Sequence, residues 1–327
     1  MTTPTAKPSD DFRVIITGAG GFVGSPLIAA LRRLLPINSE LLGTTRDTTD
    51  CDDNQTLDVT DSTAVSEVIA KFQPTHIVHL AALSAISDAE QHSRSAWDVN
   101  LIGTLNVADA IMRHCPEACL ISISSAQVYG FTANVENILT EDSIVKPANI
   151  YGVTKASSDL ALIQMATKGL KTIILRPFNH TGPSQEEAFA IPSFAAQIAR
   201  IEAGIQLPVI KVGTLDSSRD FLDVRDVADA YSLAVTKSNE IASGTIINIA
   251  SGKPHRMGEI LDKLISMSNV SIEIEYDVAR SRPNDIPNFA GDTGRAKALL
   301  GWHAKYDFDD TLKDVLNYFR QEYKKQT

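Results

Sequence analysis

The chain has 327 residues, of which 43% are hydrophobic and 21% are charged, a composition typical of a globular protein with a large core. With 30 basic and 40 acidic side chains its net charge is −10, which argues against nucleic-acid binding, because a phosphate-binding surface needs a basic excess. No apolar run reaches the roughly 18–20 residues that span a bilayer, and residues 1–11 lack the apolar stretch of a signal peptide. Three cysteines are too few for a disulfide framework, so we expect a cytoplasmic protein.

Short apolar strands alternate with amphipathic helices over the first 180 residues. We expect strands at Arg13–Thr17, Leu41–Thr44, Thr75–Leu80, Leu120–Ser124 and Thr172–Arg176. We expect helices near residues 22–35, 62–72, 89–115 and 151–168. Strand and helix in turn imply a parallel sheet with right-handed crossovers, so the predicted fold class is α/β, a Rossmann-type doubly wound sheet.

The regular alternation of strands and helices ends after Pro177, where loops rich in Gly, Pro and Asn surround shorter elements. The predicted helices here are Val227–Thr236, Met257–Met267 and Thr311–Arg320, and the predicted strands are Thr245–Ile249 and Ser271–Glu275. We therefore expect a Rossmann domain over residues 12–177, to which 224–250 and the C-terminal helix return. Residues 178–223 and 251–308 are expected to form a smaller α+β substrate lobe.

A glycine-rich turn follows the first strand and opens the first helix. Gly18 permits a tight turn, Gly21 lets the backbone approach a pyrophosphate, and Gly24 lets helix and strand pack closely. Free N–H groups and a partial positive charge at the helix N-terminus suit an anion. The turn therefore indicates dinucleotide binding, and a glycine-rich turn without a ligand is the alternative.

The GxxGxxG spacing of this turn is typical of extended short-chain dehydrogenases/reductases, and three further segments resemble that family. Residues 57–61 (LDVTD) resemble its adenine-binding acidic turn, residues 79–82 (HLAA) its loop beside the cofactor phosphates and ribose, and residues 99–104 (VNLIGT) its NVxGT helix segment. The resemblance implies a set of cofactor-binding residues: Gly18, Gly21, Phe22, Val23, Asp58, Val59, Leu80, Ala81, Ala82, Asn100, Tyr151, Lys155 and Pro177. Asp58 is equally consistent with a cap of the helix from Ser62, and Asn100 with a plain buried amide or with a residue that stabilises the active-site backbone.

The choice between NAD(H) and NADP(H) depends on the end of the second strand. An acidic residue there binds a ribose 2′-OH, whereas an arginine accommodates a 2′-phosphate. The strand ends in Thr44-Thr45-Arg46, and Asp47 comes one residue later. We therefore favour NADP(H), bound by Arg46. If Arg46 is only a solvated side chain, NAD(H) is used as well.

A serine, a tyrosine and a lysine have the spacing of a proton-transfer site. Tyr151 and Lys155 are four residues apart at the head of a helix, so their side chains share a face. An ammonium stabilises phenolate, so we expect Lys155 to lower the pKa of Tyr151, ordinarily about 10, toward working pH. Ser125 follows the fourth strand, and its hydroxyl can share a proton with a substrate oxygen. These three predict a hydride-transferring enzyme, whereas Tyr129 has no lysine four residues on and is expected to pack.

Gln127 bears on which reaction is catalysed. The resembled sugar-nucleotide 4,6-dehydratases carry Glu or an Asp-Glu pair at this position, which moves protons at C5 and C6. An amide cannot take up a proton near neutral pH. Dehydration is therefore disfavoured, while carbonyl reduction and 4-epimerisation remain possible.

Three motifs of the second lobe resemble the nucleotide-sugar-binding loops of the family. They are RPFNHTGP at 176–183, a segment ending RDFLDVRDV at 212–227, and RPNDIP at 282–287. The resemblance implies that Arg219 and Arg282 hold the substrate diphosphate by charge-assisted contacts and that Asn179 touches it. Each arginine alone is equally consistent with a salt bridge. The implied substrate-binding set is completed by Ser84, Ser125, Ala126 and Gln127.

Together the motifs most resemble the GDP-4-keto-6-deoxy-D-mannose reductases, which form GDP-D-rhamnose, and related reductases of dTDP-sugars. The implied activity is NAD(P)H-dependent reduction of the C4 ketone of a nucleotide-linked 4-keto-6-deoxyhexose. One alternative is a nucleotide-sugar 4-epimerase with tightly bound NAD. Another is a non-catalytic NADP-binding regulator, against which the intact Ser125, Tyr151 and Lys155 count.

Relatives pair the helices near residues 89–115 and 151–168 across a two-fold axis into a four-helix bundle, so the resemblance implies a homodimer. Five apolar side chains on these helices are equally consistent with a core within one chain: Ile111, Met112, Leu160, Ile163 and Met165. We expect no metal site, because His79, His180 and His255 lack metal-ligand spacing.

Overall fold

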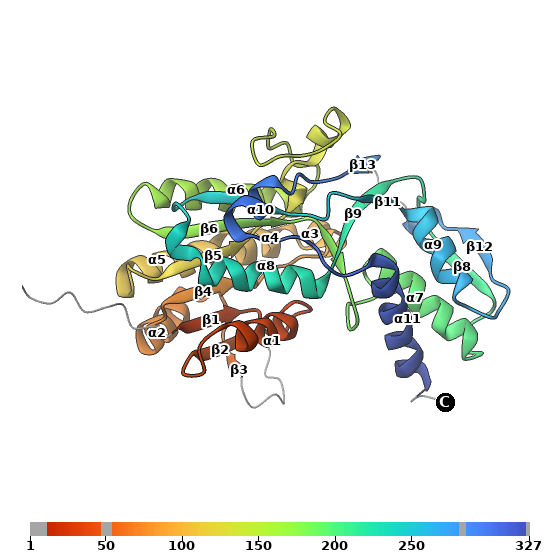
Figure 1. The fold of residues 1–327 in the computed structure, drawn as a ribbon, viewed down its shortest axis with the longest axis horizontal. Coiled ribbons are helices and arrows are strands. Elements are labelled where there is room, and N and C mark those ends of the chain that lie inside the picture. Colours follow the sequence, from red (N-terminus) through yellow and green to blue (C-terminus); the bar gives the residue numbers. More distant parts are fainter. Residues whose placement is uncertain (1–11, 47–53, 281–285, 325–327) are drawn as a thin grey trace, which may run out of the picture.

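The computed structural model describes residues 12–46, 54–280 and 286–324, and a parallel sheet forms the centre of its larger lobe (Figure 1). Its strands are β1 (Arg13–Thr17), β2 (Glu40–Thr45), β3 (Asn54–Thr56), β4 (His76–His79), β5 (Cys119–Ile123), β6 (Lys171–Pro177) and β10 (Thr245–Ile249). They pair in parallel in the order β10-β6-β5-β4-β1-β2-β3, which confirms the predicted doubly wound α/β class. The order reverses between β1 and β4, and such sheets bind ligands beyond the carboxyl ends of the strands at this point.

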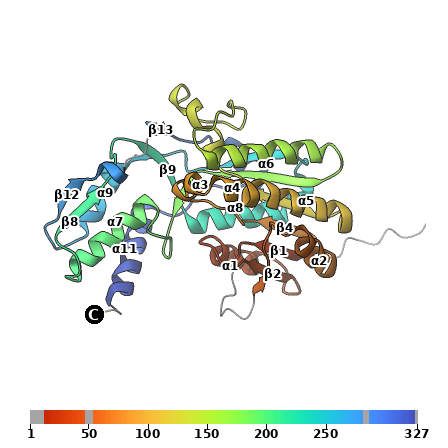
Figure 2. The same ribbon diagram turned by 180° about the vertical axis from the view of Figure 1, so that it is seen from behind.

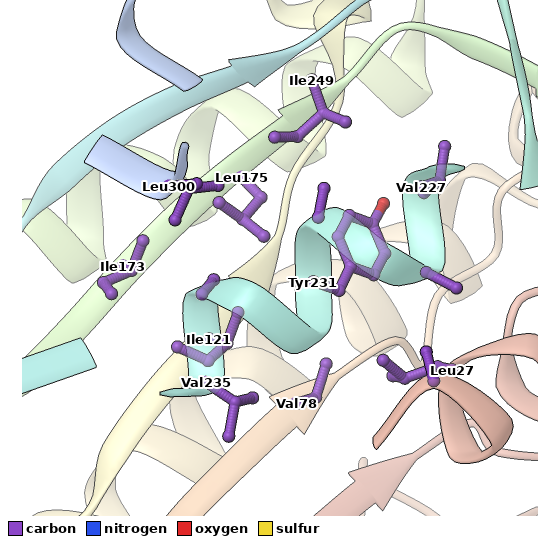
Figure 3. Packing of buried hydrophobic residues seen from close by; sticks show 14 of the residues in the cluster. Leu27, Val78, Ile121, Ile173, Leu175, Val227, Tyr231, Val235, Ile249 and Leu300 are labelled. Atoms are coloured by element: carbon purple, nitrogen blue, oxygen red, sulfur yellow. The ribbon is translucent and has the colours of Figure 1, made fainter. Parts of the chain in front are cut away.

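Helices cover both faces of the sheet because alternate residues of each strand point to opposite sides. Val14 and Ile16 belong to one core cluster, and Ile15 between them belongs to another. The first cluster is covered by α1 (Gly24–Leu34) and α8 (Val224–Thr236), and Figure 3 shows Tyr231 of α8 among its apolar side chains. The second is covered by α2 (Ser62–Phe72), α5 (Gly103–His114) and α6 (Ile150–Ala166).

The helix predicted near residues 89–115 is divided into shorter pieces. They are α3 (Ile86–Gln91), α4 (Ser93–Trp97), a π-helical segment (Asp98–Ile102) and α5. Inside the π-helical segment the carbonyl of Asn100 accepts hydrogen bonds from the hydroxyls of Thr104 at 2.7 Å and Ser158 at 2.8 Å. A widened turn of this kind frequently occurs at a functional site.

The smaller lobe groups away from the sheet (Figures 1 and 2). Its helices, α7 (Ala190–Glu202), α9 (Met257–Ser266) and α11 (Phe308–Lys324), share one core cluster. Its strands are β7 (Asn179–Thr181), β8 (Val209–Val212), β9 (Ser218–Asp223), β11 (Pro254–Arg256), β12 (Glu273–Tyr276) and β13 (Asn288–Phe289). β9 pairs with β7, β11 and β13, and β8 pairs with β12. The remaining helical pieces are α10 (Gly294–Leu300) and the 3-10 turns Ala126–Val128, Gly130–Asn134, Ser238–Glu240 and Val278–Arg280.

The C-terminal helix corrects one expectation. We expected it to return to the larger lobe, but the apolar face of α11, which includes Leu312 and Phe319, packs in the cluster of α7 and α9. The segment that returns is α10 with Trp302, whose indole N–H donates to the carbonyl of Asp226 at 3.0 Å. Within the described part of the chain, no helix combines the length and the apolarity needed to cross a bilayer.

Several elements of the smaller lobe were not predicted, among them α7, β7, β8 and β9. The sequence of β9, Ser-Arg-Asp-Phe-Leu-Asp, does not alternate apolar and polar residues. Its partner strands come from three different parts of the chain between residues 179 and 289. Tertiary pairing, rather than local propensity, therefore makes this segment a strand.

Candidate active site

The glycine turn between β1 and α1 has the geometry of a phosphate cradle. Gly18 has φ 71°, and a Cβ there would lie 2.7 Å from the Ala81 backbone nitrogen. At Gly24 a Cβ would lie 1.9 Å from the Ala19 carbonyl oxygen, whereas at Gly21 it would meet only the Gly18 carbonyl oxygen, at 3.2 Å. α1 has no side-chain cap and no acidic residue in its first turn. The Gly24 N–H donates to the Gly21 carbonyl at 3.0 Å and Pro26 has no N–H, so the positive end of the helix is what favours an anion here, and the turn fits a dinucleotide pyrophosphate.

The same turn contacts the loop after β6. Phe22 and Val23 are half-buried at its end, and the ring of Phe22 stacks on His180 with the centroids 6.0 Å apart. Pro177 is buried at the end of β6, opposite Ile249 of β10. The structure therefore brings these predicted cofactor residues to the carboxyl edge of the sheet.

Arg46 and Asp58 lie at the edge of the sheet formed by β2 and β3. Arg46 is exposed directly after β2, and Asp47 lies outside the described residues. Asp58 is exposed and accepts from the backbone and hydroxyl of Thr60, at 2.9 Å and 2.8 Å. Asp61, not Asp58, caps α2, so the capping alternative for Asp58 is wrong. Val59 is buried and packs closely against Gly103, where a Cβ would lie 2.7 Å from Val59 Cγ2.

Asn100 holds the loop after β4, which contains Leu80, Ala81, Ala82 and the exposed Ser84. It is fully buried; its Oδ1 accepts from the Leu83 backbone at 2.8 Å, and its Nδ2 donates to the Leu83 carbonyl at 3.3 Å and to the Thr154 hydroxyl at 3.0 Å. All three of these bonds join the amide to protein groups. Asn100 therefore ties this loop to α6, and its contact with the cofactor stays a prediction.

Ser125, Tyr151 and Lys155 meet between the end of β5 and the first turns of α6. Ser125 is 7% exposed and accepts from the Gln127 backbone at 3.2 Å. Lys155 is 3% exposed and donates to the Ile123 carbonyl at 2.7 Å. Tyr151 is half-buried and hydrogen-bonds Ser125, so the structure places the three predicted catalytic residues together at the junction of β5 and α6.

The pKa values in this group differ from our expectation. Burial raises the pKa of Tyr151 to about 12, hydrogen bonding with Ser125 partly opposes this rise, and Asp159 adds to it. Burial lowers the pKa of Lys155 to about 8, and Asp159 opposes that change. The expectation that Lys155 acidifies Tyr151 is wrong for the protein groups alone, because desolvation of the phenol dominates and the ammonium is directed to the Ile123 carbonyl.

A buried ion pair below this group was missed by sequence reasoning. Arg176 Nε donates to Asp159 Oδ2 at 2.9 Å, with the two side chains 3% and 2% exposed. Arg176 Nη1 also donates to the Tyr129 hydroxyl at 3.1 Å, which donates to Asn248 Oδ1 at 2.6 Å. Tyr129 packs, as expected, but it also completes this network. The available signal was the placement of Asp159 four residues after Lys155 on the same helix face.

Gln127 is held by the residue that caps α6. Asn149 Oδ1 accepts from the Gly152 backbone at 2.8 Å, and Asn149 Nδ2 donates to Gln127 Oε1 at 3.1 Å. Asn149 was missed, although an Asn directly before a helix is a recognisable N-cap. The methyl group of Ala126 is buried among core residues, so only its backbone is available to a substrate.

The predicted diphosphate residues lie on neighbouring strands. Asn179 is half-buried on β7 opposite Phe221 of β9, two residues beyond Arg219. Arg219 Nη1 donates to the carbonyls of Ser218 at 2.8 Å and Ile286 at 2.6 Å. Arg282 lies outside the described residues. Arg219 therefore links β9 to Ile286, which follows Arg282 by four residues in the sequence.

His79 lies between two threonine hydroxyl groups in the interior. His79 is fully buried, with Nδ1 2.7 Å from the Thr17 hydroxyl and Nε2 3.1 Å from the Thr104 hydroxyl. Burial, and secondarily the charge of Lys155, lowers the pKa of His79 to about 3, so its ring is neutral. Among the described residues no group of three or more His, Cys, Asp or Glu side chains is arranged to hold a metal ion.

Comparison with known proteins agrees with this geometry. The family model described as GDP-mannose 4,6 dehydratase matches residues 15–315. A GDP-6-deoxy-D-mannose reductase from Pseudomonas aeruginosa is 31% identical over 312 residues, which cover 93% of this chain and 96% of that protein. A UDP-glucose 4-epimerase from Rhizobium meliloti is 29% identical over 274 residues, 80% of this chain and 82% of that protein.

A solved structure matches over nearly the whole chain. The structure of RMD from Pseudomonas aeruginosa complexed with NADPH superposes with a TM-score of 0.83 at 28% identity, and covers 95% of this chain and 99% of that one. The glycine turn, the grouping of Ser125, Tyr151 and Lys155, and these similarities agree. The chain therefore belongs to the GDP-mannose 4,6-dehydratase family, among the extended short-chain dehydrogenases/reductases of the epimerase/dehydratase type.

Proposed function

We propose that this protein reduces the C4 ketone of a nucleotide-linked 4-keto-6-deoxyhexose, with GDP-4-keto-6-deoxy-D-mannose as the first candidate substrate and a dTDP analogue as the second. The observation that carries the proposal is the grouping of the buried Ser125 and Lys155 with the half-buried Tyr151, at the same carboxyl edge of the sheet as a turn that fits a dinucleotide. The similarity to a GDP-6-deoxy-D-mannose reductase supports the same reaction.

Tyr151 is the proposed proton donor. A phenol with a pKa of about 12 is protonated at neutral pH, so it is ready to protonate the alkoxide that forms at C4. Ser125 supplies a second hydroxyl, which hydrogen-bonds the carbonyl oxygen and stabilises the developing charge. When bound, NAD(P)H supplies the hydride.

Lys155 and the residues around it hold the site in place. Its ammonium is fixed by the Ile123 carbonyl and lies near the carboxylate of Asp159, four residues on, which places it to hold the cofactor ribose. Asn100 fixes the loop that contains Ala81 and Ala82. Arg219, Arg282 and Asn179 are proposed to bind the diphosphate. Arg282 is included only because of its sequence motif.

The proposed cofactor is NADP(H), with NAD(H) as the alternative. Gly18, Gly21 and the first turn of α1 would hold the pyrophosphate. Arg46, exposed directly after β2, would meet a 2′-phosphate. The related structure with NADPH supports this preference.

The nearest alternative is a nucleotide-sugar 4-epimerase, favoured by the epimerase among the relatives. The GDP-6-deoxy-D-mannose reductase is 31% identical over 93% of this chain, whereas the epimerase is 29% identical over 80% of it, so reduction is the first proposal and epimerisation the second.

One assay separates the alternatives. The protein is mixed with GDP- or dTDP-4-keto-6-deoxyhexose, and NADPH and NADH absorbance are followed in separate reactions. A reductase consumes one reduced cofactor per product. An epimerase carries NAD after purification and needs none added, and a non-catalytic regulator binds dinucleotide but consumes nothing.

We further propose a homodimer formed through α5 and α6. Ile111 and Leu162 are buried within the chain, but Leu160 on α6 is 65% exposed and Ile102, directly before α5, is 42% exposed. A four-helix bundle made with a second copy would cover these two side chains. Sedimentation of the wild type and of Leu160→Glu tests this, and the variant is expected to sediment as a monomer.

The proposed location is the cytoplasm. Cys115 and Cys119, the described cysteines, are buried free thiols. Free thiols of this kind agree with a reducing compartment. Cell fractionation tests this location.

A further inference from the structure

The orientation of the Asn149 side chain is fixed by the backbone. Asn149 is the N-cap of α6, and its side chain meets the Gly152 N–H at 2.8 Å. An N–H group only donates, so the atom that faces Gly152 must be the amide oxygen. The amide nitrogen of Asn149 therefore points to its other neighbour, Gln127.

The orientation of Gln127 follows from that of Asn149. Asn149 Nδ2 only donates, so the atom of Gln127 that lies 3.1 Å away must be the oxygen Oε1. The Gln127 NH₂ group consequently faces the other way. Among the described residues this NH₂ group has no hydrogen-bond partner. It is also not one of the fully buried side-chain atoms that lack a partner.

Gln127 lies between the two proposed hydroxyl groups of the site. Its backbone N–H donates to Ser125 Oγ at 3.2 Å, and the Ser125 hydroxyl also hydrogen-bonds Tyr151. Its carbonyl is packed against α6, because a Cβ at Gly152, next to Tyr151, would lie 2.5 Å from that oxygen. The unused NH₂ group is thus held next to the place where the ketone is expected to react.

We propose that Asn149 is a specificity-determining positioning residue, which turns Gln127 so that the site presents an amide donor to an acceptor oxygen of the ketosugar. The inference rests on the proposed ketone reduction. A ketone oxygen accepts hydrogen bonds and cannot donate one, so a site lined by donors suits a ketosugar. A site that presents an acceptor at the same place leaves two oxygens facing each other.

Two substitutions of Asn149 separate capping from orientation. Asn149→Ser keeps a side-chain oxygen for Gly152 and removes the donor to Gln127. Asn149→Asp also keeps the cap, but its second oxygen accepts, so Gln127 must rotate and direct its own oxygen to the substrate. We expect the KM for GDP-4-keto-6-deoxy-D-mannose to be at least about tenfold higher in Asn149→Asp than in Asn149→Ser, because an acceptor replaces a donor. The KM for NADPH is expected to change less than about twofold, since neither side chain is placed at the dinucleotide.

The same pair in a Gln127→Ala background is the decisive control. Asn149→Asp also adds a negative charge, and that effect persists without Gln127, whereas the orientation effect disappears. We expect the difference between the Asp and Ser variants to fall below about twofold in this background. An undiminished difference there, or equal KM values in the Gln127 background, would overturn the inference.

Gln127→Glu provides a second route if Asn149→Asp does not fold. The carboxylate still accepts from Asn149 Nδ2 but offers no donor to the substrate, so a comparable rise in KM is expected at unchanged melting temperature. An unchanged KM in a folded Gln127→Glu protein would also overturn the inference. Absence of NADPH consumption by the wild type with any 4-ketosugar defeats the proposed function itself, and the inference with it.

Discussion

Replacing Lys155 by methionine measures what the buried ammonium costs the fold. Lys155 is 3% exposed, and burial lowers its pKa from an ordinary value of 10.5 to about 8. At about 1.36 kcal/mol per pKa unit, this corresponds to about 3.4 kcal/mol of lost unfolding free energy at neutral pH. The folded pKa is the lower one, so the unfolded chain binds more protons between these two values. The cost is therefore constant below pH 8 and decreases as the pH rises toward 10.5.

Lys155→Met removes this cost but leaves the Ile123 carbonyl without its donor, a loss of about 1–3 kcal/mol. We expect the variant to be inactive yet at least as stable as the wild type at pH 7. The difference in unfolding free energy between the variant and the wild type should change by about 2.5 kcal/mol in favour of the wild type between pH 7 and pH 10, because most of the cost of burying the ammonium has gone at pH 10. Equilibrium urea unfolding at both pH values measures this, with Lys313→Met on the exposed face of α11 as the matched control. A stability difference that is the same at both pH values would refute the reasoning.

Three further predictions test the site. Tyr151→Phe should lower kcat by about 10²–10⁴-fold while NADPH still binds in a fluorescence titration; retained turnover would remove its role as proton donor. Arg46→Ser should raise the KM for NADPH by roughly 10- to 100-fold and leave that for NADH nearly unchanged, because it removes a charge-assisted contact to the 2′-phosphate; equal effects on both would contradict the NADP(H) preference. Asp159→Asn leaves the charge of Arg176 buried and unpaired, and should lower the urea unfolding free energy by about 3–5 kcal/mol; a loss under about 1 kcal/mol would speak against a buried ion pair.

Local pattern was sufficient for most elements of the larger lobe, although it missed β3 and the division of the helix predicted near residues 89–115. The apolar runs at β1, β4 and β5 are buried on both faces, and their positions agree with the strands of the structure to within a residue or two. The glycine turn was readable because φ and close backbone approach restrict residue type at Gly18 and Gly24. The Tyr151–Lys155 spacing was readable because helix geometry alone places residues four apart on one face.

What the sequence by itself determined is therefore the Rossmann fold and the glycine turn after its first strand, and it also supplied the prediction that Ser125, Tyr151 and Lys155 form one group. Only the tertiary structure decided that Asn100 positions a loop, that α11 packs on α7, and that Asp159 pairs with Arg176. It also decided the direction of the Tyr151 pKa, because desolvation depends on everything that surrounds a side chain. The physical reason is common to these cases: each depends on contacts between residues far apart in the chain, and no local spacing encodes which distant partner a buried polar group will meet.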